Sequence, residues 1–309
     1  MIEQSPLEQI FTDHKDAKFV FVQPGGNYGD WLIYFGLEVL AKKLKCSFRS
    51  LSAEEFLTQK ITSDEILYLH GGGGYNRWCS GKSLKVLEHA LCSDARLVVQ
   101  GPCTIDQDSD YLENSLAKVL NAPRKPTLYF IAREMTTFGL CEDYLAETDT
   151  HFFHDQDTAF WAGKDLLESF AGPSRCKYRF YALREDNESS GQNIHDFGNG
   201  VQLDPAYFCK SFKHWIRVHL YAKEIITTRT HSAVVAALLN KPVVLYPSKY
   251  HKNRSIWEYS LQHRNVIWGE NEDRAYRKTP SKLHYLPARV RNSYRVNQAA
   301  RWLQRVPLS

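Results

Sequence analysis

Short apolar segments alternate with segments of helical periodicity along most of this chain, and that alternation most restricts its fold. In the first half, four apolar runs have the length of buried strands, at residues 18–23, 66–70, 97–100 and 128–132. Four longer segments have the apolar spacing of amphipathic helices, at residues 31–44, 83–92, 111–120 and 136–146. A repeated order of strand and helix predicts an α/β fold with a parallel sheet.

The pattern breaks at the turn residues Ala171-Gly172-Pro173-Ser174. A second series of strands and helices follows, at residues 178–183, 212–222, 225–228, 232–239 and 243–246. The length of 309 residues and the hydrophobic fraction of 43% are enough for two cores. We therefore predict two facing Rossmann-like, doubly wound domains, residues 1–172 and 173–309, with the active site in the cleft between them.

Targeting signals and cysteine spacing bear on where the protein works. The first residues lack the basic and apolar regions of a secretory signal, and no run approaches the roughly 18 apolar residues that span a bilayer. The seven cysteines show no C-x-x-C spacing, which argues against both a disulfide framework and a zinc site. We expect a cytoplasmic protein with buried free thiols and no resident metal or cofactor.

The charge of the chain is unevenly distributed. Residues 271–309 contain nine Lys or Arg and two acidic residues, a net charge of +7, whereas the whole chain carries +4. Such a segment can be the solvated face of a C-terminal helix, or it can contact an anionic membrane surface. We expect no nucleic-acid partner, and we keep peripheral contact with the inner face of a membrane as an alternative.

Several cationic side chains follow strands of the second domain. The segment Thr228-Arg229-Thr230-His231-Ser232 links a predicted strand to a predicted helix, so that Arg229 and His231 would share one face of an extended segment beside free helix N–H groups. Taken alone, this triplet also fits a capping arginine and a hydrogen-bonded core histidine. Three more cations follow neighbouring strands, Arg184, Lys249 and Lys252. Together they predict a site for a ligand with phosphate and carboxylate groups.

Two glycine-rich segments follow strands of the first domain. Residues 24–30 read Pro-Gly-Gly-Asn-Tyr-Gly-Asp, in which Asn27 and Asp30 offer polar groups at a helix start, although Asp30 also fits a plain helix cap. Gly71 to Gly74 favour close approach of a ligand or of a facing backbone, and we expect Gly72 and Gly73 to bind substrate. Neither segment has the spacing of a dinucleotide or P-loop motif.

The ordered set of motifs resembles the polysaccharide pyruvyl transferase family. The resemblance rests on Gly-Asn-Tyr-Gly-Asp, the four glycines, and Arg-Thr-His-Ser-Ala followed by Lys-Pro-Val-Val, and it spans roughly residues 20 to 255. Mid-chain landmarks of the same kind are Ala132-Arg133-Glu134 and residues 155–160. The chain departs from the family pattern in two places. Arg-Thr-His-Ser replaces the commoner Arg-x-His-Gly, and beyond about residue 260 no motif of the family can be matched to the sequence.

The resemblance implies a GT-B-like fold and transfer of a pyruvyl group from phosphoenolpyruvate to two hydroxyls of a saccharide, which we expect to be lipid-linked. It implies that the second domain holds the donor and the first domain the acceptor. Arg184, Arg229 and His231 match family active-site positions. His231 would be the general acid, because histidine exchanges protons near neutral pH, and Asp30 would orient or deprotonate a hydroxyl.

Two other functions remain open from the sequence. A glycosyltransferase of the same fold would place the cationic cluster on the diphosphate of a nucleotide sugar, but no two glutamates after Arg184 have the Glu-x7-Glu spacing frequent in that class. A saccharide-binding protein without catalysis would use the 7 Trp and 17 Tyr as stacking surfaces. The polar loop at residues 185–200 would be either a cover over the cleft or an ordinary surface loop.

Overall fold

A computed structural model describes residues 4–79, 81–190 and 200–269 of the chain, which forms two compact units. Unit 1 comprises Met1–Gly26 and Asp30–Trp161, and unit 2 comprises Asn27–Gly29 and Ala162–Ser309. The division therefore falls after Trp161 and not after residue 172, because helix α8 (Lys164–Ala171) packs within unit 2. There the Arg217 Nε donates to the Ala171 carbonyl at 2.6 Å. The basic segment 271–309 lies outside the described residues.

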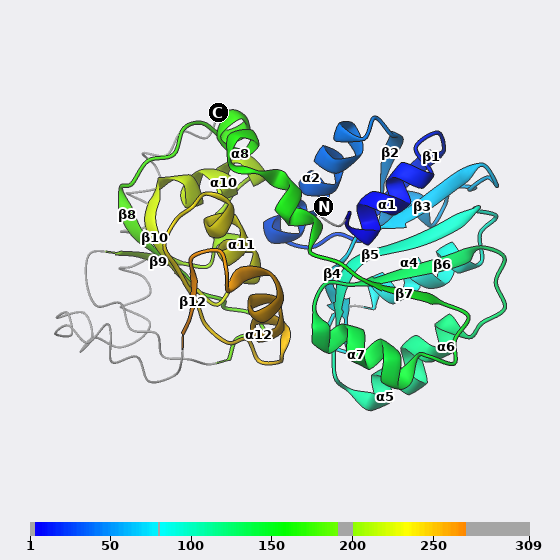
Figure 1. The fold of residues 1–309 in the computed structure, drawn as a ribbon. Helices are drawn as coiled ribbons and strands as arrows, with labels where there is room; N and C mark the ends of the chain where they lie inside the picture. Colours follow the sequence, from blue (N-terminus) through cyan, green and yellow to red (C-terminus); the bar gives the residue numbers. More distant parts are fainter. Residues whose placement is uncertain (1–3, 80, 191–199, 270–309) are drawn as a thin grey trace. The chain divides into compact units, whose positions relative to one another are not determined.

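Unit 1 contains a seven-stranded parallel sheet (Figure 1). Its main path runs in the order β2 (Ser47–Ser52), β1 (Lys18–Gln23), β3 (Glu65–Leu69), β5 (Leu97–Ile105), β6 (Thr127–Ala132) and β7 (His151–His154), and β4 (Gly72–Tyr75) pairs with the end of β5. In register, Phe19 pairs with Phe48 on one side and with Ile66 on the other. Apolar residues fill both faces of the central strands, as a doubly covered parallel sheet requires.

Side chains alternate between two separate cores on the two faces of this sheet. Phe19 and Phe21 of β1 point into a core with α1 (Pro6–Asp13) and α2 (Tyr28–Lys43), whereas Val20 and Val22 point into the other. The second core is covered by helical segments between Ala53 and Tyr144, namely α3 (Ala53–Phe56), α4 (Lys82–Leu91), α5 (Ser109–Tyr111), the π-helix η1 (Leu112–Leu116), α6 (Ala117–Leu120) and α7 (Met135–Tyr144).

Unit 2 contains a five-stranded parallel sheet in the order β12 (Val266–Trp268), β11 (Val243–Leu245), β10 (Ala222–Thr227), β8 (Tyr178–Ala182) and β9 (Gly200–Leu203). Helices α10 (Phe212–Tyr221) and α11 (Thr230–Leu238) pack on the central strands. The other helical segments of unit 2 are α9 (Pro205–Phe208), α12 (Lys252–Ile256) and the π-helix η3 (Trp257–Leu261), whereas the 3-10 helix η2 (Thr158–Ala162) spans the division between the units. The predicted α/β class with parallel, Rossmann-like sheets is thus confirmed.

Local sequence signals set the helix boundaries. Ser5 caps α1 by accepting from the Glu8 N–H at 3.1 Å, and Pro6 occupies the first helical position. Ser52 and Glu55 form a capping box at α3. Helix α11 ends where Asn240 adopts a φ of 54°, with Pro242 two residues later. At these three helices, interactions within a few residues of the chain mark the boundary.

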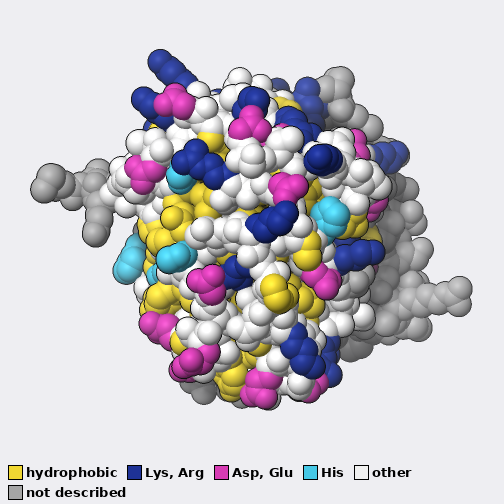
Figure 2. Space-filling view, turned by 90° about the vertical axis from the view of Figure 1, so that its right-hand side faces the viewer, with side chains coloured by type: hydrophobic (Ala, Val, Ile, Leu, Met, Phe, Trp, Pro, Cys, Tyr) yellow, Lys and Arg dark blue, Asp and Glu magenta, His cyan; other side chains and the backbone are white. Residues whose placement is uncertain are grey.

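The surface shown in Figure 2 has basic and acidic side chains interspersed, so that face presents no broad basic area to a polyanion. Within the part of the chain described here, no helix is both long and apolar enough to cross a membrane. All seven cysteines are free thiols. The expectation that they are buried is met by Cys46, Cys103, Cys141 and Cys209, but Cys92 and Cys176 are exposed.

His70 gives unit 1 a titratable group inside its core. Its ring lies 4.4 Å from the ring of Tyr34 and edge-on to Phe21 and Tyr68, and neither ring nitrogen has a hydrogen-bond partner among the described residues. Burial lowers the pKa of His70 to about 3. Since the unfolded chain binds this proton more readily, the stability from the neutral ring is complete above pH 6.5 and is lost as the pH falls towards 3.

We expect His70→Phe to flatten the acid side of the stability curve of unit 1. From the pKa shift of His70, the free energy of unfolding of the wild type should fall by about 2 kcal/mol when the pH is lowered from 7 to 5. The variant lacks this titrating group and should not show that part of the loss. Urea denaturation at both pH values measures the difference, with the exposed His263→Gln as control. Equal losses in wild type and His70→Phe would mean that His70 can be protonated in the folded state.

Candidate functional site

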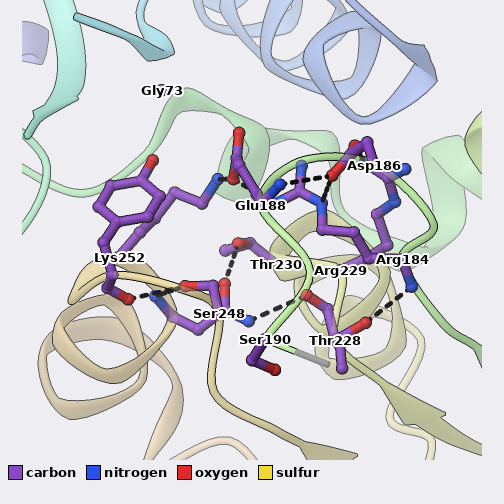
Figure 3. A network of polar contacts seen from close by, with 12 residues as sticks. Gly73, Arg184, Asp186, Glu188, Ser190, Thr228, Arg229, Thr230, Ser248 and Lys252 are labelled. Carbon is purple, nitrogen blue, oxygen red and sulfur yellow. Dashed lines mark hydrogen bonds and ion pairs between the residues drawn. The ribbon is translucent and has the colours of Figure 1, made fainter. Parts of the chain in front are cut away.

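Three cationic side chains meet at the carboxyl edge of the unit 2 sheet. Arg184 follows β8, Arg229 follows β10 and Lys252 follows β11, and Figure 3 shows all three in one polar network. Each side chain is only 7% exposed. The structure therefore brings these three predicted residues together, because parallel strands place their carboxyl ends on the same edge.

Three carboxylates, which sequence reasoning missed, neutralise this group. Asp204 faces Arg229 as a fork, accepting from Nε at 2.9 Å and from Nη2. Asp186 lies 2.9 Å from both the Arg184 Nε and the Arg229 Nη1. The Glu188 carboxylate accepts from both the Arg184 Nη1 and the Lys252 Nζ. We name these six side chains the ionic network: Arg184, Arg229, Lys252, Asp186, Glu188 and Asp204.

The network favours the charged form of its members. Burial opposes ionisation of Glu188, but the Lys252 ammonium and the Arg184 guanidinium outweigh it and lower the pKa of Glu188 to about 2. Burial also opposes the charge of Arg229, yet the hydrogen bond and charge of Asp204 raise its pKa. The formal charges of the three cations and three carboxylates cancel.

His231 lies on a different element from the one predicted. Helix α11 begins at Thr230, with Arg229 as its N-cap residue at φ −93° and ψ 114°, so His231 is the second residue of the helix. The expectation that Arg229 and His231 share one face of an extended strand was therefore wrong. His231 is half-buried in the first turn, where backbone N–H groups favour negative charge.

Asn253 holds the start of α11 against two strand ends. Its Nδ2 donates to the Thr228 carbonyl at 3.0 Å and to the Tyr246 carbonyl at 2.8 Å, and its Oδ1 accepts from the Thr230 hydroxyl at 2.5 Å. Asn253 is fully buried. Asn253, the second residue of α12, thus joins the helix start that carries Lys252 to the segment after β10 that carries Arg229.

The serine that replaces the commoner glycine after His231 has a partner in the core. The Ser232 hydroxyl lies 2.9 Å from the His219 Nε2, while the His219 Nδ1 lies 2.7 Å from the Trp215 carbonyl. Burial is the main cause that lowers the pKa of His219 to about 4, so the ring is neutral and can accept from Ser232. Ser232 thus adds a contact between α10 and α11.

Among the described residues, Lys249 contacts the loop of the ionic network through its backbone. Its N–H donates to the Glu188 carbonyl at 3.1 Å, and its side chain is exposed. The same loop accepts from Ser190, whose hydroxyl donates to the Pro247 carbonyl at 3.0 Å. The described part of the predicted loop, residues 185–190, is therefore anchored within unit 2, and residues 191–199 lie outside the described residues.

In unit 1, Asp30 lies against the two glycine segments. A Cβ added to Gly26 would be 2.2 Å from the Asp30 Oδ2, and one added to Gly72 would be 3.4 Å from its Oδ1. Both glycines have positive φ, 122° and 131°. The glycines at these positions therefore make room for the Asp30 carboxylate.

The helix cap that follows β1 is Asn27 and not Asp30. The Asn27 Oδ1 accepts from the Gly29 N–H at 2.8 Å, as an N-cap residue does, and Asp30 occupies the first turn of α2. The alternative that Asp30 is a plain cap was therefore wrong. Asn27, which we expected to bind substrate, has this capping role.

Most of the four-glycine run is explained by packing within unit 1. A Cβ on Gly71 would lie 1.8 Å from the Pro102 carbonyl of β5, and one on Gly74 would lie 2.1 Å from the Ser83 hydroxyl. The Gly73 carbonyl accepts from the Asn76 Nδ2 at 2.6 Å. At Gly71 the facing backbone, and not a ligand, requires glycine.

The mid-chain landmarks meet in the interior of unit 1. The Arg133 Nη1 lies 2.7 Å from the Asp157 Oδ2, and its Nε donates to the Thr104 hydroxyl at 2.8 Å. Asp155 accepts from the Leu7 N–H at 2.8 Å. These side chains are buried, and they join β5, β6 and the segment after β7. Their contacts are structural.

Metal binding finds no support within the described ranges, where no three His, Cys, Asp or Glu side chains gather in a way that could hold an ion. In unit 2 the ionic network gathers charged side chains beyond the carboxyl ends of parallel strands, and in unit 1 the half-buried Asp30 follows β1. Arg and Lys in such a setting bind phosphate and carboxylate groups.

The fold and the site define a Rossmann-like α/β protein with a cationic group at one sheet edge. No known protein family and no curated protein matches the sequence. A solved structure of an uncharacterized protein from Klebsiella pneumoniae is similar, with a TM-score of 0.65 and 18% identity over 85% of this chain and 97% of that one. This likeness shows the fold.

Two structures of the wall teichoic acid polymerase TagF are also similar. They have TM-scores of 0.33 and 0.32, with 11% and 10% identity. The first covers 95% of this chain and 86% of that one, and the second covers 96% and 85%. TM-scores this low carry no argument about fold or function.

Proposed function

We propose that the protein is a ketal pyruvyltransferase of GT-B-like fold, which moves a pyruvyl group from phosphoenolpyruvate to two hydroxyls of a saccharide. The acceptor would be a lipid-linked glycan of exopolysaccharide, capsule or cell-wall synthesis. The observation that carries the proposal is the convergence of Arg184, Arg229 and Lys252 beside the start of α11. The motif resemblance assigns the donor to this unit. The interdomain active site and the cytoplasmic location stay predictions from sequence.

The proposed donor suits the cations. Phosphoenolpyruvate is a small trianion with a planar carboxylate and a phosphate, and two guanidinium forks plus an ammonium offer paired donors to both groups. The same groups would stabilise the phosphate as it departs. A nucleotide sugar would in addition need a base pocket.

The reaction would proceed as follows. His231, as imidazolium, gives a proton to C3 of phosphoenolpyruvate, and a saccharide hydroxyl forms a bond to C2 while its proton passes to Asp30. The second hydroxyl then bonds to C2 as the C2–O bond to phosphate breaks, and its proton leaves with inorganic phosphate. The proton held by Asp30 returns to His231 through solvent before the next turnover. The products are a pyruvate ketal and one hydrogen phosphate dianion, so atoms and charges balance and no oxidation state changes.

Phosphoenolpyruvate is expected to raise the melting temperature of the purified protein, and uridine or guanosine diphosphate sugars are not. A ligand that binds only the folded state adds about 2.7 kcal/mol at a hundred times its Kd. Differential scanning fluorimetry measures both series at one ionic strength. Stabilisation by a nucleotide sugar alone would favour the glycosyltransferase alternative.

Turnover separates an enzyme from a saccharide-binding protein. Phosphate should be released from phosphoenolpyruvate only when a model saccharide or lipid-linked glycan is present, and the saccharide should gain the mass of a pyruvate ketal. Saccharide binding with no phosphate release across a panel of acceptors would point to a protein without catalysis.

A further inference from the structure

Two carboxylates of the ionic network each join two cations. Asp186 lies between Arg184 and Arg229, and Glu188 lies between Arg184 and Lys252. An oxyanion that binds a cluster of Arg and Lys makes the same kind of bridging contact. The carboxylates therefore take the donor groups that an anionic ligand would use.

Asp204 differs from these two residues. Besides its fork with Arg229, it accepts from the Ala206 N–H at 3.1 Å and the Glu185 N–H at 3.0 Å, as the N-cap of α9. Its side chain is only 1% exposed, compared with 26% for Asp186 and 12% for Glu188. Asp204 is thus part of the framework.

Asp186 and Glu188 sit on a segment without regular secondary structure, residues 183–190. A local turn places them, in which the Ser189 N–H donates to the Asp186 carbonyl at 2.9 Å. The segment is tied to residues 247–249 by two hydrogen bonds, from Lys249 N–H and from the Ser190 hydroxyl. The Glu188 N–H also donates to the Asp186 carboxylate at 3.1 Å. Besides the ion pairs, this local hydrogen bond is the one among the described residues that movement of the Asp186 carboxylate would break.

The charge balance gives this arrangement a consequence. With all six groups present the network is neutral, so a bound dianion would add uncompensated negative charge in a largely buried place. Without Asp186 and Glu188, the three cations face Asp204 alone and carry a net charge of +2. That charge matches a phosphate dianion.

We infer that Asp186 and Glu188 are internal competitors of the anionic ligand, which must displace their carboxylates from Arg184, Arg229 and Lys252 in order to bind. The inference deepens the proposed function and rests on it for the identity of the ligand. The two carboxylates keep the affinity of the site for anions low. A multivalent anion that contacts all three cations at once can replace them. A monovalent anion gains too few contacts to do so.

The test is the double variant Asp186→Asn, Glu188→Gln, which keeps size and removes both charges. Isothermal titration with inorganic phosphate, inorganic pyrophosphate and phosphoenolpyruvate should show Kd at least tenfold lower than in wild type. The matched control is Glu224→Gln, Glu258→Gln, which removes two carboxylates paired with Arg179 and Arg254 elsewhere in unit 2. Its Kd values should stay within about twofold of wild type. Unchanged or weaker anion binding by the folded double variant would overturn the inference, because the carboxylates would then position the cations.

Two further outcomes keep this test separate from that of the proposed function. Pyrophosphate or a nucleotide sugar could bind more tightly to the double variant while phosphoenolpyruvate binds to neither protein. That result would support the competition by Asp186 and Glu188 and would contradict phosphoenolpyruvate as the donor. If phosphoenolpyruvate binds wild type and the variant equally, the donor stands and the competition falls. Should the double variant fail to fold, Asp186→Asn alone is expected to lower Kd about threefold, and no change there would overturn the inference.

Discussion

His231→Gln is expected to lower the turnover of phosphoenolpyruvate-dependent phosphate release about 100-fold or more, the usual effect of losing a general acid. Glutamine keeps the size and hydrogen-bonding capacity of the side chain, but it cannot deliver a proton at neutral pH. Binding of phosphoenolpyruvate should persist, because the proposed contacts to the donor come from Arg184, Arg229 and Lys252. Steady-state kinetics with calorimetric Kd values separates the two effects.

The exposed His263→Gln is the matched control in the same unit and should leave turnover unchanged. Near-normal turnover of folded His231→Gln would remove His231 as the acid and require another proton donor. Arg229→Lys is a less clean probe of donor binding than His231→Gln is of proton transfer. Arg229 is buried and paired with Asp204 and Asp186, so an ammonium there would lose stability as well as donor affinity.

Asn253→Asp is expected to destabilise unit 2 by about 4 kcal/mol at neutral pH. The carboxylate would place acceptors against the Thr228 and Tyr246 carbonyls, losing two buried hydrogen bonds and leaving like dipoles opposed. Part of the loss should return in acid, because a protonated aspartate can donate one hydrogen bond. Urea denaturation followed by tryptophan fluorescence measures the change.

Asn121→Asp, at an exposed position of unit 1, should change stability by no more than about 0.5 kcal/mol. A folded Asn253→Asp protein with wild-type stability would show that the hydrogen bonds of Asn253 to Thr228, Thr230 and Tyr246 do not contribute to the free energy of unfolding. Thr230→Val removes the hydroxyl that donates to Asn253, which is a single hydrogen bond. It should lower the free energy of unfolding by less than Asn253→Asp does.

The interior strands could be predicted from sequence, and the edge strands could not. Strands β1, β3, β6 and β8 start within a residue of their predicted positions, because continuous apolar runs are typical of strands buried on both faces. The four strands at the sheet edges were missed, namely β2, β7, β9 and β12. They are short or half-exposed, as in Ser47–Ser52, so they lack such runs. Glycines hid β4.

The site divided in the same way. Arg184, Arg229 and Lys252 could be expected together, because they follow parallel strands and the topology fixes that edge. Asp186 and Glu188 could not, since their positions depend on the path of an irregular loop. Asp204 follows the missed strand β9, although Asp before Pro205 is a signal for a helix cap that could have been read.

The contact between Gly71 and the Pro102 carbonyl changes how mutational scans of this protein should be read. Alanine at Gly71 would collide with the backbone of unit 1 itself, so an inactive variant there reports misfolding and not a lost ligand contact. A deep scan would therefore show an intolerant glycine run that imitates a binding loop. Solubility measured beside activity for each variant would separate positions that the fold needs from those that a saccharide touches.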